Sequence, residues 1–394
     1  MGMIKLFLRL LICFSLLLSC KKDVISNPDY YYNYLSSGDS STIHPKSALY
    51  QSVLDEFINN GAVGTSVMIK DQHGTWLGTS GYADIISNIK TRPGNRYLIA
   101  SVSKVFTATA IFSYVDNGII SLDDPINKWI DKSITDKIDN ANHCKIRHLL
   151  SHTGGIPDIY NFNHLMEYIN RPFNHWDDKD MLKFVYGKST RLKVDEGWSY
   201  SNVNYILLGM ILEKVSGSTL KEVYETKIFH PLNLLSAYYD INENKLNSGV
   251  VKGYTDINSN NIYVEAREFY EDDIGIGGCG GIAINAQDLG KFMNELMKGN
   301  LISRQSLDAM NNWLDFYYKP NGKAGFGLFS NMGEFGEEVG HNGGFMGFEA
   351  SVTYFPEQDV LIVILINTDS ILASKRYKDA LNKYLQDIRK AIFN

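Results

Sequence analysis

The chain has 394 residues, of which 44% are hydrophobic and 21% charged, and its formal net charge is −6 at pH 7. This length suffices for one large domain or two smaller ones, each with a sizeable core. Residues 1–20 contain Lys5 and Arg9 and no acidic residue, so the rest of the chain has 36 basic and 44 acidic side chains and a net charge of −8. This charge argues against a nucleic-acid partner, which requires a basic face.

The N-terminus has the pattern of an export signal. Lys5 and Arg9 flank an apolar run, residues 6–18, that is too short to span a bilayer comfortably. Ser19-Cys20 directly follows the run. The whole pattern is similar to a bacterial lipoprotein signal, in which cleavage precedes Cys20 and its thiol receives lipid. The alternative is an ordinary signal peptide that contains Cys20. We therefore expect an exported protein anchored by lipid to the cell envelope, on the periplasmic or the outer surface, with residues 1–20 as the signal peptide.

The next segments predict a tether, a helix and a hairpin. Residues 21–46 lack hydrophobic periodicity and are expected to form a flexible tether. A helix is predicted over residues 47–59, with a face formed by Leu49, Val53, Leu54, Phe57 and Ile58. Two strand-like runs follow, residues 64–71 and 75–83, and the turn residues between them predict a β-hairpin.

The stretch that follows predicts a helix with a nucleophile at its start. Apolar residues recur at three- and four-residue steps until the turn residues Asp116-Asn117-Gly118, and Ser101 stands at the opening. Residues three apart share a helix face, so Lys104 projects beside Ser101. A desolvated lysine can take the proton of a serine hydroxyl, because burial lowers its pKa. The same spacing occurs at Ser218 and Lys221, where a solvated helix face is the simpler interpretation.

The middle of the chain is predicted to be mainly helical, and strands return near the C-terminus. Helices are expected at residues 146–151, 179–186, 203–216, 220–229 and 286–297, strands at 324–329, 348–355 and 360–367, and a last helix at 374–392. Residues 360–366 are apolar on both faces, as in a central strand.

These elements predict one α/β (α+β) domain over residues 47–394, in which an antiparallel sheet is flanked by helices. The sheet is expected from about residues 47–100 and 320–394, with a mainly helical lobe inserted at about 118–310.

Three motifs occur in an order that resembles the serine β-lactamase and penicillin-recognising family. They are Ser101-Val102-Ser103-Lys104, Tyr200-Ser201-Asn202 and His341-Asn342-Gly343. The stretches at residues 146–156 and 197–202 match that family as well, and the resemblance covers roughly residues 47–370. It implies a β-lactamase-like fold in the branch of class C β-lactamases, D-alanyl-D-alanine carboxypeptidases, D-amino-acid peptidases and esterases.

The resemblance also implies roles for these residues. Ser101 would form an acyl-enzyme, Lys104 would take its proton, and Tyr200, with a pKa lowered by nearby cations, would share the base role and protonate the leaving group. The N–H groups of Ser101 and Gly344 would form the oxyanion hole. Substrate would be bound by Asn202 and by an edge strand that carries His341, Asn342 and Gly343.

One position departs from the class C pattern, which usually has Lys-Thr-Gly at the third motif. A neutral imidazole at His341 holds a substrate carboxylate less firmly than an ammonium, and its charge changes near pH 6.5. The departure argues against efficient β-lactam hydrolysis and leaves slow acylation by penicillins open. We therefore expect a hydrolase of amide or ester bonds in small or D-amino-acid-containing peptides, with a class C-like β-lactamase and a non-turnover penicillin or cell-wall-peptide sensor as alternatives.

No metal or other cofactor is expected. His143, Cys144, His148 and His152 form a cluster with a metal-like spacing, but it lacks the glutamate of His-Glu-x-x-His, and the family stretch accounts for His148 and His152. Export permits a disulfide between Cys144 and Cys279, and two buried thiols are an equally good interpretation.

Overall fold

The computed structural model describes residues 41, 43–159, 176–239, 249–266, 277–315, 321–371 and 373–394. The predicted signal peptide, Cys20 and nearly all of the predicted tether lie outside these ranges. Within them, each helix is too short or too polar to cross a bilayer.

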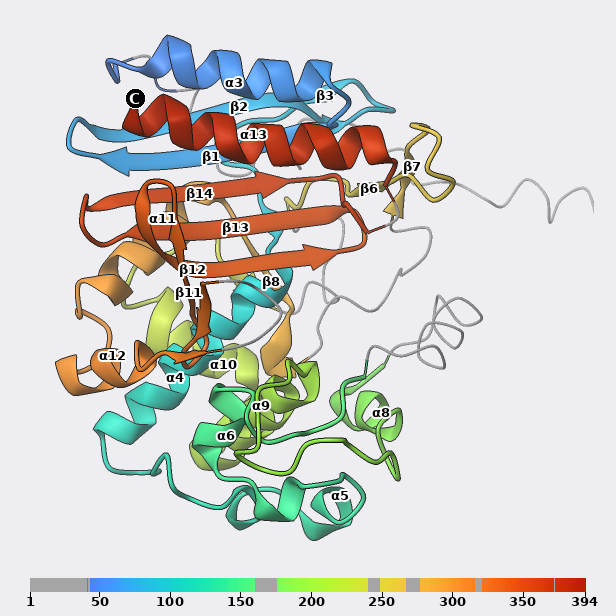
Figure 1. The fold of residues 1–394 in the computed structure, drawn as a ribbon, viewed down its shortest axis with the longest axis vertical. Helices are drawn as coiled ribbons and strands as arrows, with labels where there is room; N and C mark the ends of the chain where they lie inside the picture. The colour runs from blue at the N-terminus through green and yellow to red at the C-terminus, as the bar shows by residue number, and fades with distance from the viewer. Residues whose placement is uncertain are drawn as a thin grey trace, which may run out of the picture.

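A nine-stranded antiparallel sheet forms one half of the molecule (Figure 1). Its order is β3-β2-β1-β14-β13-β12-β11-β10-β9, so strands from the two ends of the chain are neighbours at the β1–β14 pair. The strands are β1 (Gly64–Asp71), β2 (Gly74–Asp84), β3 (Ile89–Lys90), β9 (Leu314–Asp315), β10 (Gly322–Ala324), β11 (Phe329–Gly333), β12 (Gly336–Phe345), β13 (Phe348–Phe355) and β14 (Val360–Ile366). The predicted antiparallel sheet with helices around it is confirmed.

Two terminal helices cover one face of this sheet, α3 (Ser47–Asn59) and α13 (Lys375–Phe393) (Figure 1). Phe57 of α3 stacks on Tyr384 of α13 with the ring centroids 4.2 Å apart. Every residue of β14 is buried, because its other face packs on the helical half of the molecule. The apolar run of residues 360–366 is therefore the central strand that its composition predicted.

The helical half is built around α4 (Ser103–Asp116), whose residues 103–112 are all buried. Phe106 of α4 stacks on Phe292 of α11 with the centroids 3.7 Å apart. The other described helices are α5 (Lys132–Thr135), α6 (Ile146–Leu150), α8 (Asp178–Lys183), α9 (Asn202–Ser216), α10 (Leu220–Tyr224), α11 (Ala286–Met297) and α12 (Arg304–Met310). Small sheets pair β4 (Tyr97–Leu98) and β5 (Tyr238–Tyr239) with β8 (Ile282–Ile284), and β6 (Tyr254–Thr255) with β7 (Val264–Glu265).

The structure corrects two local predictions. Residues 324–329 do not form one strand: β10 ends at Ala324 and β11 begins at Phe329, and Gly327 turns the chain between them with φ +79°. A Cβ at Gly327 would lie 2.6 Å from the Cβ of Ala108, so this turn packs directly on α4. On α3, Leu49 is 47% exposed and Tyr50 is buried in its place, because the helix presents Tyr50, Leu54 and Phe57 to the sheet. The hairpin of β1 and β2 is confirmed.

Candidate active site

Ser101 lies in a tight turn between β4 and α4 rather than in the helix itself. The turn is the 3₁₀ element η1 (Ala100–Val102), and Ala100 before Ser101 has φ +45°, a conformation that costs energy for a residue with a Cβ. The strand β12 passes against this turn, since a Cβ at Gly343 would lie 3.0 Å from the backbone nitrogen of Ser101. The nucleophile candidate is therefore held between the start of α4 and the sheet.

Lys104 is completely buried one turn further on, as its spacing predicted. Its Nζ lies 3.0 Å from Ser101 Oγ, and it donates to Asn202 Oδ1 at 2.8 Å and to the Cys279 carbonyl at 3.0 Å. Burial lowers the pKa of Lys104 to about 8, against the opposing influence of Cys279 and Asp158. A lysine with this pKa is partly unprotonated near neutral pH and is able to accept a proton.

Tyr200 completes the group around the serine hydroxyl, because its hydroxyl donates to Ser101 Oγ at 3.0 Å. The expectation of a lowered pKa for Tyr200 is wrong: burial raises it above its ordinary value. The nearby cation does not reverse this effect, since Lys104 Nζ lies 5.1 Å from the centroid of the Tyr200 ring. Tyr200 is therefore a proton donor in the resting site.

His152 supports Tyr200 from behind. The two rings stack with their centroids 4.4 Å apart, and His152 Nδ1 accepts hydrogen bonds from Ser201 N and Asn204 Nδ2. The other histidine of this segment, His148, accepts at Nδ1 from the backbone N–H of Lys145. His152 thus supports Tyr200, whereas His148 stabilises the first turn of α6.

Asn202 lies between Lys104 and Asp158. It is buried, its Oδ1 accepts from Lys104, and its Nδ2 donates to both carboxylate oxygens of Asp158 at 3.3 Å. The amide is therefore used within the protein, between a lysine and a carboxylate. Sequence reasoning missed Asp158, although it lies only two residues beyond the characteristic stretch at residues 146–156.

The third motif lies on β12, which as a whole is an inner strand between β11 and β13 but is unpaired on one side at this motif. Pairing with β11 stops at Gly340, whereas pairing with β13 continues to Phe345, so residues 341–344 have a strand on one side only in the described sheet. Gly343 packs against the Ser101 turn, and a Cβ at Gly344 would meet nothing within 4 Å. Asn342 is exposed, and its Oδ1 accepts from Ser351 Oγ at 2.9 Å.

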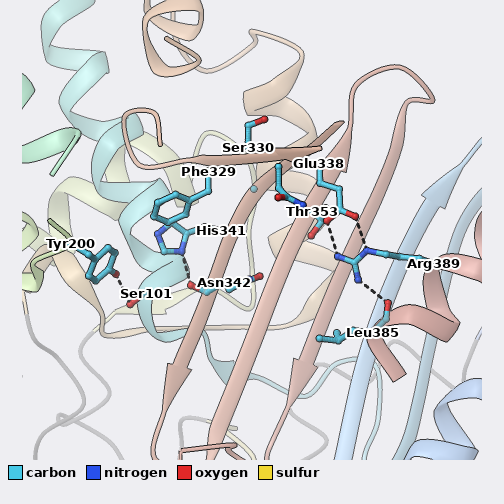
Figure 2. A pocket seen from close by; sticks show the side chains of 12 residues that line it. Ser101, Tyr200, Phe329, Ser330, Glu338, His341, Asn342, Thr353, Leu385 and Arg389 are labelled. Atoms are coloured by element: carbon cyan, nitrogen blue, oxygen red, sulfur yellow. Dashed lines mark hydrogen bonds and ion pairs between the residues drawn. The ribbon is translucent and has the colours of Figure 1, made fainter. Parts of the chain in front are cut away.

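His341 is buried and neutral, which corrects the expected charge change near pH 6.5. Burial lowers its pKa to about 3, and the nearby Lys104 charge acts in the same direction. Its Nδ1 lies 2.6 Å from the Asn342 carbonyl (Figure 2). A carbonyl only accepts, so Nδ1 carries the proton and Nε2 is left as an acceptor.

A pocket of about 620 Å³ extends from Ser101 along β12 to Arg389 of α13 (Figure 2). Ser101 and Tyr200 line one end, with Phe329 and His341 beside them. At the other end Arg389 of α13 forms a two-pronged ion pair with Glu338 of β12, with N–O distances of 3.0 and 3.1 Å. The sequence offered no pattern that pairs these two residues, which are 51 positions apart.

Cys144 and Cys279 are both buried thiols and do not form a disulfide. Burial raises the pKa of each to about 12, so neither is a reactive thiolate at neutral pH. The contribution of Cys279 to the site is its backbone carbonyl, which accepts from Lys104.

Comparison with known proteins gives a consistent result. A family model described as Beta-lactamase matches residues 50–385. Penicillin-binding protein 4* of Bacillus subtilis (strain 168) is 28% identical over 335 residues, which are 78% of this chain and 68% of the relative. Protein flp of Staphylococcus aureus (strain MRSA252) is 26% identical over 326 residues; the match covers 81% of this chain but only 62% of that relative.

A solved structure shares the fold. The D-amino acid amidase from Ochrobactrum anthropi SV3, complexed with L-phenylalanine amide, is similar with a TM-score of 0.78 and 24% identity, over 88% of this chain and 98% of that one. The sheet, the helical half and their connection are thus those of a known architecture.

Proposed function

This chain belongs to the beta-lactamase family, and from that premise we propose that it is a serine hydrolase that cleaves amide or ester bonds through an acyl-enzyme on Ser101. The observation that carries the proposal is the convergence on one hydroxyl: Lys104 Nζ and Tyr200 Oη each lie 3.0 Å from Ser101 Oγ. A base and an acid within hydrogen-bond distance of one nucleophile are what acyl transfer requires.

The proposed reaction begins with neutral Lys104, which takes the hydroxyl proton while Ser101 Oγ bonds to the substrate carbonyl carbon. The negative charge that moves to the carbonyl oxygen is stabilised by the N–H groups of Ser101 and Gly344, a contribution worth about 3 kcal/mol per donor in related reactions. Tyr200 gives its proton to the departing nitrogen or oxygen as the bond to the carbonyl carbon breaks, and Lys104 returns a proton to Tyr200. Water then attacks the ester of Ser101, which releases the acid and restores the serine.

The electrostatics of the pocket favour substrates without a carboxylate next to the scissile bond. His341 is neutral and offers an acceptor, which suits an N–H or an ammonium group of the substrate. Arg389 is the one arginine or lysine among the described lining residues, and its guanidinium is already paired with Glu338. We therefore propose amides and esters of amino acids or short peptides, including D-amino acids, ahead of carboxypeptidase substrates. The name of the similar amidase agrees with this class.

The direct test is labelling of the nucleophile. A fluorophosphonate probe and a fluorescent penicillin are expected to label the wild type, and Ser101→Ala should abolish labelling with an unchanged circular dichroism spectrum. Ser103→Ala is the matched control, because Ser103 lies two residues away, is buried in α4 and is not among the described residues that line the pocket. Labelling that persists in Ser101→Ala would refute the proposed nucleophile.

A second measurement separates an enzyme from a binding protein. Release of p-nitrophenol from an aminoacyl p-nitrophenyl ester is expected to continue at a steady rate after any burst. A burst of one equivalent with no later turnover would instead favour the sensor interpretation.

We also propose that the protein is exported and lipid-anchored through Cys20, on the basis of the N-terminal pattern alone. Radiolabelled palmitate should be incorporated into the wild type in a bacterial host and not into Cys20→Ser. Incorporation into both would overturn the assignment of Cys20.

A further inference from the structure

The three neighbours of the Lys104 amine determine where its lone pair points. A neutral amine has two N–H bonds and one lone pair. Two carbonyl oxygens, Asn202 Oδ1 at 2.8 Å and Cys279 O at 3.0 Å, accept the two N–H bonds. The remaining neighbour is Ser101 Oγ at 3.0 Å, so the lone pair is directed at the hydroxyl proton.

This arrangement depends on which end of the Asn202 amide faces Lys104. An asparagine side chain has an acceptor oxygen at one end and a donor nitrogen at the other. If the amide were rotated, its Nδ2 would donate to Lys104, and the lone pair would be occupied by Asn202 and turned away from Ser101. Lys104 can therefore act as the base only if the Asn202 amide is held in one orientation.

Asp158 is placed to do this. Its Oδ1 accepts from the backbone N–H groups of Ile159 at 2.8 Å and Asn202 at 2.9 Å, which anchor the carboxylate. Both of its oxygens lie 3.3 Å from Asn202 Nδ2. A carboxylate only accepts hydrogen bonds, so it admits the NH₂ end of the amide and excludes the oxygen.

Resting on the proposed function, we propose that Asp158 is a positioning residue: it fixes the Asn202 amide so that its oxygen faces Lys104, and thereby aims the Lys104 lone pair at Ser101. Asp158 is not among the described residues that line the pocket at Ser101. Its role is to set the direction of a proton transfer that occurs two side chains away.

The charge of Asp158 gives the proposal a readout that a purely structural role would not affect. The described titratable groups around Lys104 are Asp158, the Cys279 thiol, Tyr200, Tyr205, His152 and His341. Burial raises the pKa of the Asp158 carboxyl, and the hydrogen bonds from Asn202 and Ile159 and the Lys104 charge oppose that rise by favouring the carboxylate. The carboxylate in turn raises the pKa of Lys104. Removing that charge should lower the pKa of Lys104.

The test compares Asp158→Asn with the wild type in two measurements. We expect the rate of acylation by an aminoacyl ester to fall roughly 10- to 100-fold, because a misdirected base loses that much in comparable cases, with little change in KM. In the Asn202→Ala background the same substitution should change the rate less than about threefold, since residues that act through one another are not additive. Losses that multiply in the double variant would overturn the proposal.

The second measurement does not require turnover. In Ser101→Ala, the Lys104 Cε resonance of ¹³C-lysine-labelled protein is followed against pH, with Lys104→Arg used for assignment. The titration midpoint should move to lower pH when Asp158→Asn is added, and an unchanged midpoint would refute the proposal. If the wild type has no Ser101-dependent activity, the proposed function fails, while this titration still shows whether the charge of Asp158 acts on Lys104. Asp158→Ser, which keeps an acceptor without the charge, replaces Asp158→Asn if that variant does not fold.

Discussion

The imidazole of His152 stacks on the phenol of Tyr200 at an interplanar angle of 29°, and this contact fixes the ring whose hydroxyl reaches Ser101 Oγ. Phenylalanine at position 200 preserves the stack and removes only the hydroxyl. The consequence of that change should therefore depend on how much the leaving group needs a proton.

Tyr200→Phe should slow amide hydrolysis by roughly 10²- to 10³-fold, the usual contribution of a general acid. The kcat/KM for a p-nitrophenyl ester, whose leaving group departs without a proton, should fall by less than about tenfold. The measurement is kcat/KM for an aminoacyl p-nitrophenyl ester and for the matching amide. Tyr205→Phe is the control: its hydroxyl donates to the Leu150 carbonyl, so its loss should lower stability and affect both substrates equally. Equal losses for the two substrates in Tyr200→Phe would exclude the acid role.

The pH dependence should report Lys104. Because the base must be unprotonated and its pKa is lowered to about 8, acylation should fall tenfold per pH unit below that value and level off above it. The raised pKa of Tyr200 predicts no second loss below about pH 10. Lys104→Arg, which cannot release its proton, should lose activity by about 10³-fold or more. A single limb near pH 6.5 would point instead to a histidine, in conflict with the buried, neutral His341.

His341→Lys should change the preference of the pocket. An ammonium there can bind a substrate carboxylate with a charge-assisted hydrogen bond, so KM for a D-Ala-D-Ala peptide should fall about tenfold relative to the wild type. His341→Gln, which adds no charge, is the control and should show no such gain. The comparison uses the ratio of kcat/KM for this peptide to that for an uncharged D-aminoacyl amide. A wild type that already prefers the free carboxylate would contradict the proposed substrate class.

Two neighbouring glycines provide a matched test of the contact between β12 and the Ser101 turn. Gly343→Ala would place a Cβ in collision with the Ile99 carbonyl and 3.0 Å from Ser101 N. We expect a loss of roughly 1–3 kcal/mol in the free energy of unfolding and weaker labelling of Ser101. Gly344→Ala meets open space and should unfold at nearly the wild-type temperature in calorimetry. Similar stabilities for the two variants would mean that the strand does not press on the turn.

The sequence by itself determined the features that depend on short spacings. The i, i+3 relation of Ser101 and Lys104, the β1–β2 hairpin and the terminal helix α13 follow from local patterns, and each is found where it was predicted. The order of the three motifs carried the family resemblance and with it the antiparallel sheet. The spacing, the hairpin and the helix could be predicted from the residues because their physical causes lie within a few residues of one another, whereas the sheet came only through the resemblance.

Only the tertiary structure decided the protonation and orientation of the site residues. Tyr200 and His341 were assigned the wrong titration behaviour from sequence, because the desolvation that governs a pKa comes from segments far away in the chain. For the same reason the sequence did not reveal that Asp158 hydrogen-bonds to the Asn202 amide on the side opposite its bond with Lys104. Chemical identity is local, but the burial and partners that give a group its charge state exist only once the chain has folded.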